Sequence, residues 1–152
     1  MSDYNEPGEP THEPLDMDLV WDLGECIDEV CPDGKLTQTK LAEIARSQSV
    51  PLSHVYAAAA FDPEYEWEQT SDRIITVCLG ACQGWGACEI ADSLLRMMES
   101  SADGQAPRYT VQAVGCLDRC MSPVAVDVAC GDEVVRHALI RPGAEGQLVD
   151  LD

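Results

Sequence analysis

Two pairs of cysteines with the same spacing constrain this chain more than any other feature. Cys78 and Cys82 enclose three residues, and Cys116 and Cys120 also enclose three. Each pair follows a short apolar segment that is typical of a buried strand. Since loops that leave adjacent strand ends lie at one edge of a sheet, we expect the four thiols to converge on one point, as a metal cluster requires.

The remaining composition favours metal binding over disulfides. The chain has eight cysteines in 152 residues, and its first ten residues are acidic rather than basic and then apolar as in a signal peptide. No apolar stretch approaches the roughly 18 to 20 residues of a membrane-spanning helix. We therefore expect a cytoplasmic protein with no direct membrane insertion, in a compartment that keeps thiols reduced.

The charge of the chain excludes two classes of partner. Nine Lys and Arg residues against 28 Asp and Glu residues give a net charge of −19. Such a field repels phosphate backbones and anionic lipid headgroups, so nucleic acids and membrane surfaces are poor candidates. The acidity is equally consistent with a role in solubility alone.

Spacing and ligand type rank the candidate metal centres. Zinc sites with four cysteines usually leave two residues within each pair, whereas both pairs here leave three. The closely spaced cysteine run of bacterial four-iron clusters is absent, and a Rieske centre needs histidines near the cysteines, whereas His12, His54 and His137 lie elsewhere. A [2Fe-2S] cluster fits best, and a zinc site is the alternative.

The identity of the second ligand has two candidates among the cysteines. Cys88 lies six residues after Cys82 and is an alternative second ligand. We expect Cys26, Cys31 and Cys130 to be buried apolar side chains without a metal.

Small residues flank the first pair. Gly80, Gly84 and Gly86 let the backbone come close to a cluster and direct N–H groups at its sulfur atoms. Trp85 either shields the site from water or serves in docking to a partner.

The apolar pattern predicts a mixed α/β chain. Apolar residues at steps of three and four predict helices over residues 15–30, 37–48, 53–61 and 87–98. We expect Ser53 to be the N-cap of the third helix. Apolar and alternating runs predict strands over residues 74–77, 109–113, 124–129 and 134–135. The last two strands flank a turn signal at 130–132 and should form a hairpin.

From residue 36 to about residue 135 the chain resembles a known family, chiefly in the segments ITVCLGACQGWGACEIADSLL and VGCLDRCMSPVAVDV. This family is the small thioredoxin-like iron–sulfur subunit of respiratory complex I. Its relatives include the gamma subunits of NAD-dependent formate dehydrogenases and the diaphorase subunits of bidirectional hydrogenases. The resemblance implies a short helical bundle followed by a thioredoxin-like [2Fe-2S] ferredoxin domain.

The expected division of the chain follows from this resemblance and from the apolar pattern. It comprises a disordered acidic tail at 1–14, a helical element of about three helices at 15–65, a ferredoxin domain at 73–140 and a C-terminal tail at 141–152. The C-terminal tail lacks the final helix that is usual in the family.

The resemblance also implies the ligands. Cys116, Cys120, Pro123 and Val124 match the family pattern. The first pair encloses three residues where the family usually has four. The distance from Cys82 to the following Gly-Ala agrees with the family, which favours Cys82 over Cys88. The ligand set implied for the cluster is therefore Cys78, Cys82, Cys116 and Cys120.

Charged residues depart from the family pattern inside the second pair. Asp118 and Arg119 stand where small residues are common.

The resemblance implies an electron-transfer subunit that is not catalytic alone. It would work beside a flavin- and NAD(H)-binding subunit of an NAD(P)-linked oxidoreductase of the NADH dehydrogenase, formate dehydrogenase or hydrogenase type. The chain itself lacks a dinucleotide fingerprint, because no acidic ribose ligand follows its glycine-rich loop at the expected distance. The alternative is a zinc-binding or metal-free assembly module. A thiol enzyme of the thioredoxin type is disfavoured, because no cysteine pair with a two-residue gap opens a helix.

Overall fold

The computed structural model describes residues 12–62, 64–69, 71–100, 109–117, 124–137 and 140. The fourth predicted ligand, Cys120, and its neighbours Asp118, Arg119 and Pro123 lie outside these residues, as does the C-terminal segment 141–152.

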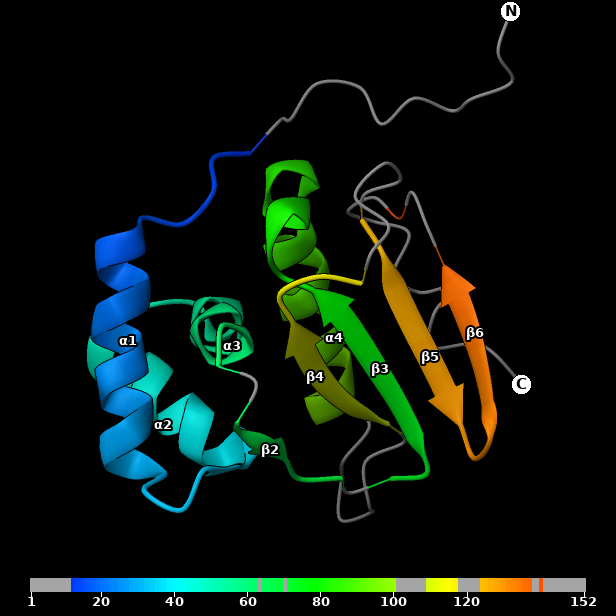
Figure 1. Cartoon of the computed structure of the whole chain (residues 1–152), viewed down its shortest axis with the longest axis horizontal. Coiled ribbons are helices and arrows are strands. Elements are labelled where there is room, and N and C mark those ends of the chain that lie inside the picture. Colours follow the sequence, from blue (N-terminus) through cyan, green and yellow to red (C-terminus); the bar gives the residue numbers. More distant parts are fainter. Residues whose placement is uncertain are drawn as a thin grey trace, which may run out of the picture.

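A group of helices stands beside a four-stranded sheet, and a further helix covers one face of that sheet (Figure 1). The helices are α1 (Met17–Val30), α2 (Gln38–Gln48), α3 (Leu52–Ala60) and α4 (Ala87–Ser100). The strands of the sheet are β3 (Arg73–Cys78), β4 (Thr110–Val114), β5 (Val126–Cys130) and β6 (Glu133–His137). All four predicted helices and all four predicted strands are present, and the predicted α/β fold class is confirmed.

The sheet has the strand order β4-β3-β5-β6. β3 and β4 are parallel and are joined through α4, whereas β5 pairs antiparallel with both β3 and β6. Gly131 supplies the positive φ angle of 62° that the tight turn between β5 and β6 requires. The predicted hairpin is thus confirmed.

The first two helices begin at side-chain caps. Asp16 accepts a hydrogen bond from the backbone N–H of Asp18 at 3.0 Å, and Thr37 accepts one from that of Lys40 at 3.2 Å. These bonds satisfy N–H groups that have no partner within the helix.

The third helix begins differently, and the prediction of Ser53 as its N-cap is wrong. Pro51 is the N-cap residue and has no side-chain capping bond. Its fixed φ angle suits the entry into a helix. Ser53 lies within the first turn, and its hydroxyl donates to Asp92 of α4.

Three short elements are not evident from the sequence pattern. β1 (Lys35–Leu36) and β2 (Glu66–Trp67) form a parallel two-residue ladder that ties the segment after α1 to the segment after α3. A 3-10 helix, η1 (Ala81–Trp85), connects the end of β3 to α4.

The alanine-rich helix α3 lies at the centre of the packing. It contacts α1, α2, α4 and β4. Ala57, Ala58 and Ala59 are buried, and their small side chains let neighbouring elements approach α3 closely. One continuous cluster of buried apolar side chains therefore runs from α1 through α3 to the sheet.

Among the described helices, none is both long enough and apolar enough to cross a bilayer.

Candidate metal centre

Cys78, Cys82 and Cys116 lie at or just after strand ends at the same edge of the sheet. Cys78 is the last residue of β3 and lies opposite Val114, the last residue of β4. Because these strands are parallel, their carboxyl ends point to the same side, where η1 and the loop after β4 begin (Figure 1). The structure thus brings together the segments that carry Cys78, Cys82 and Cys116.

The backbones of the two cysteine loops are in direct contact. The Leu79 N–H donates to the Val114 carbonyl at 2.9 Å. A Cβ atom on Gly80 would lie 1.9 Å from the Gly115 carbonyl oxygen, far inside van der Waals contact. Gly80 therefore permits a close approach between the first cysteine loop and the backbone of the second.

The environment of Cys78 favours a thiolate. The Cys82 thiol donates a hydrogen bond to the Cys78 sulfur, and backbone N–H groups of Gly80, Cys82 and Leu117 donate further bonds. Together these donors lower the pKa of Cys78 to about 6, against the opposing effect of burial. Thiolates are the form that binds iron, so this site fits the predicted cluster.

Cys82 and Cys88 have different surroundings. Cys82 is 1% exposed and bonds to Cys78, whereas Cys88 is half-buried on α4 and bonds to Ser53 of α3. Burial, followed by the negative charges of Asp92 and Glu89, raises the pKa of Cys88 to about 11, against the Ser53 hydrogen bond. The thiol of Cys88 is therefore protonated at neutral pH.

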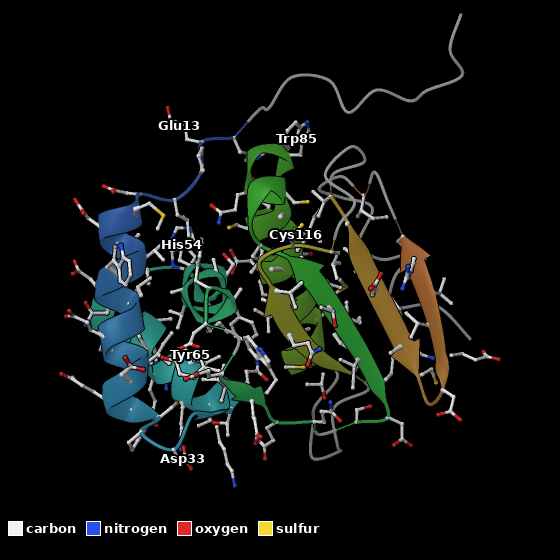
Figure 2. The ribbon with its side chains drawn as sticks, viewed as in Figure 1. Glu13, Asp33, His54, Tyr65, Trp85 and Cys116 are labelled. Carbon is white, nitrogen blue, oxygen red and sulfur yellow. The ribbon has the colours of Figure 1, made fainter. Side chains whose placement is uncertain are left out.

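Cys116 differs from the first pair in its exposure. It follows Gly115 directly and is exposed, while Cys78 and Cys82 are buried. Figure 2 shows Cys116 in the loop that leaves β4. Within the described part of the chain, which does not include Cys120, no three side chains of His, Cys, Asp or Glu already surround one point.

The three remaining cysteines only partly follow the prediction that they are buried. Cys31 is 1% exposed, and Cys26 is half-buried against the core. Cys130 is exposed, so its predicted burial is wrong. Cys130 ends β5 at the hairpin turn and pairs with the exposed Glu133, which places it beyond the core.

A buried glutamine that the sequence analysis misses connects the first cysteine loop to the N-terminal segment. The Gln83 side chain donates to the Leu79 carbonyl at 2.6 Å and accepts from the Leu15 N–H at 2.8 Å. The Gly84 carbonyl also accepts from the His12 N–H at 3.0 Å. The sequence pattern gives no sign of this contact, because Leu15 and Gln83 are 68 residues apart in the chain.

These bonds link the residues on either side of Glu13 and Pro14 to η1, through the backbone N–H groups of His12 and Leu15. His12 also pairs with Glu89 of α4 at 3.0 Å. Trp85 is half-buried at the end of η1 and lies near this N-terminal segment (Figure 2).

Comparison with known families defines the class of this protein. A family model described as thioredoxin-like [2Fe-2S] ferredoxin matches residues 23–137. The match spans most of the chain, so the protein belongs to the thioredoxin-like [2Fe-2S] ferredoxin family. The predicted [2Fe-2S] cofactor and the iron–sulfur electron-transfer role are thereby confirmed. No curated protein sequence matches the chain at a significant level.

Proposed function

We propose that this chain is the electron-transfer subunit of an NAD(P)-linked oxidoreductase and holds one [2Fe-2S] cluster beside a flavin- and NAD(H)-binding subunit. The ligands in this proposal are Cys78, Cys82, Cys116 and Cys120. The observation that carries it is the contact between the two cysteine loops at the shared end of β3 and β4.

The choice of Cys82 as second ligand has a physical basis. Its thiol already bonds to the Cys78 sulfur, so the two side chains lie together and could both serve as cluster ligands. Cys88 bonds instead to Ser53 and has a raised pKa, so binding iron there would require both a lost hydrogen bond and an unfavourable deprotonation.

The residues around Cys78 would hold the cluster and adjust its potential. When bound, such a cluster accepts and releases single electrons. N–H groups of Gly80, Cys82 and Leu117 donate toward the Cys78 sulfur and stabilise added negative charge, which raises the reduction potential. The net charge of −19 acts in the opposite direction.

A partner must supply the hydride chemistry in this proposal. The glycine-rich loop GACQGWGAC lacks the acidic ribose ligand of a dinucleotide site, and family members usually work in multi-subunit complexes. A cytoplasmic location belongs to the same proposal, since eight cysteines in a metal protein suit a reducing compartment.

Anaerobic purification of the full chain tests the cofactor and its ligands. We expect a coloured protein with equal amounts of iron and acid-labile sulfide, and a paramagnetic signal after reduction. A colourless protein that contains zinc and no sulfide would contradict the proposal and favour the assembly module.

The proposed pairing with a flavin- and NAD(H)-binding subunit needs a separate measurement. A redox titration should give a low midpoint potential, within reach of a flavin reduced by NADH. A midpoint well above zero would contradict this partner. Co-expression with flavin-binding subunits encoded beside the gene should yield a complex that reduces the cluster when NADH or NADPH is added.

A further inference from the structure

Large apolar side chains are exposed together on one side of the helical group. Met17, Trp21 and Phe61 are 49%, 70% and 50% exposed, and all three line one groove between α1 and α3 with a volume of about 470 Å³. Among the described residues, the other large apolar side chains with such exposure are Val134 and Val135 of β6. Grouped exposed apolar residues of this kind mark interaction surfaces.

A glycine in the middle of α1 contributes to the groove. Gly24 lines it, and a Cβ atom at this position would meet nothing within 4 Å. Glycine inside a helix costs roughly 0.5–1 kcal/mol relative to alanine. Since packing within this chain does not require Gly24, we ascribe its presence to the space that it leaves for an incoming side chain.

The polar side chains that line the groove are acidic. Glu25 and Asp28 of α1 lie on one side, and Asp62 lies beyond the end of α3. Tyr65 reaches toward α1, and its hydroxyl donates to Asp28 (Figure 2). The first Lys or Arg of the sequence is Lys35, so α1 carries no basic side chain.

The negative charge of the chain and of the groove lining discriminates between the molecules that could occupy the groove. A second copy of the chain carries the same net charge of −19 and the same acidic α1, so its approach is repelled. The N-terminal segment 1–11 is also acidic and contains no Lys or Arg. A partner with basic residues around an apolar face has the complementary charge.

The walls of the groove favour a helix as the occupant. They are formed by α1 and α3 and by the segment after α3, with no strand among them, so an extended peptide finds no sheet edge for its main chain. A helix satisfies its own backbone and places apolar side chains at steps of three and four along one face.

We propose that the groove between α1 and α3 is a docking site for a basic amphipathic helix of a partner protein. Trp21 and Phe61 are its apolar anchors, and Glu25, Asp28 and Asp62 bind the cations at its rim. This surface contains none of the cysteines and does not depend on the proposed electron-transfer partner.

A synthetic helix tests the proposal on the cluster-loaded full chain. The probe has leucines at steps of three and four on one face and lysines on the other, and calorimetry measures its binding. We expect saturable one-to-one binding that weakens with added salt. A helix with the same leucines and with glutamates in place of lysines should not bind.

Matched variants separate docking in the groove from general attraction to an acidic protein. Trp21→Ala and Phe61→Ala leave the net charge unchanged and should each weaken binding about tenfold or more, as expected of aromatic anchors. Gly24→Leu fills the groove and should weaken binding similarly. Val134→Ala on β6 removes an exposed apolar side chain elsewhere and should leave binding unchanged.

Three results would overturn the proposal. These are equal binding by the Trp21→Ala and Phe61→Ala variants, equal binding of the acidic helix, and self-association of the chain that Trp21→Ala abolishes. The absorption of the cluster should be the same in all these variants, so failure here leaves the redox function untouched, and the reverse also holds.

Discussion

Asp92 of α4 caps the first turn of α3 through Ser53. One carboxylate oxygen accepts from the Ser53 backbone N–H at 2.9 Å, and the other accepts from its hydroxyl at 2.7 Å. Pro51 provides no capping side chain, so a residue of another helix does this instead. The negative charge also lies at the positive end of the α3 dipole.

Removal of this carboxylate should destabilise the protein. Asp92→Ala leaves the fully buried Ser53 hydroxyl and an N–H group without their acceptor, which should lower the free energy of unfolding by about 1–3 kcal/mol. Asp92→Asn keeps an acceptor and should cost less. Glu43→Ala, at an exposed carboxylate of α2, is the control and should change little in the same denaturant titration. Equal effects of Asp92→Ala and Glu43→Ala would refute the capping role.

Gly80 should tolerate no side chain. Gly80→Ala forces the cysteine loops apart, since the added Cβ meets the Gly115 carbonyl at 1.9 Å. We expect a large loss of bound iron and sulfide per chain. Gly24→Ala adds the same group in open space and should retain iron while raising stability by roughly 0.5–1 kcal/mol. Normal iron content in Gly80→Ala would show that the loops need not touch.

The two candidate ligands give opposite expectations. Cys82→Ser should abolish or strongly shift the visible absorption of the cluster, because serine removes the proposed ligand sulfur beside Cys78. Cys88→Ser should leave the spectrum nearly intact, since that side chain bonds to Ser53. The reverse pattern would identify Cys88 as the ligand.

Gln83 should hold the N-terminal segment on the cysteine loop. Gln83→Ala removes the acceptor of the Leu15 N–H and the donor to the Leu79 carbonyl. We expect faster hydrogen exchange at Leu15 and earlier proteolysis near residue 15. Gln48→Ala, on the exposed end of α2, should change neither measurement. Unchanged exchange in Gln83→Ala would mean that other contacts hold this segment.

His54 should make stability depend on pH. Burial lowers the pKa of His54 below its usual 6.5, against the attraction of Asp92. The unfolded chain therefore binds this proton first as the pH falls, so acidification below about 6.5 should reduce stability. The loss should be smaller in His54→Gln when both proteins are unfolded with denaturant at several pH values. Parallel pH profiles of the two proteins would count against this effect.

Much of the fold follows from local sequence pattern. The helical spacing of α1 and α4 and the β-branched run of β3 identify these elements, and the turn at Gly131 identifies the hairpin. The cysteine pairs are visible because both follow strand-like segments. Local periodicity suffices for features whose partners lie nearby in the chain or repeat regularly.

Contacts between distant segments could not be predicted in this way. Ser53 and Asp92 are 39 residues apart, and Leu15 and Gln83 are 68 residues apart, and neither pair belongs to a recurrent motif. The β1–β2 ladder has only two residues in each strand, too few for alternation to be seen. The exposure of Cys130 was also not predicted. Its residue type suggests burial, but it is the last residue of β5 and lies past the core.

The end of α3 lies close to both the acidic groove and the second cysteine loop. Ala58 and Phe61, at the end of this helix, line the acidic groove, while the carbonyl of Ala60 lies 3.6 Å from where a Cβ of Gly115 would be. The groove and the loop before Cys116 thus both lie against the last turn of α3. Thermodynamic reciprocity then requires that any effect of groove occupancy on cluster reduction be matched by an equal effect of reduction on docking affinity.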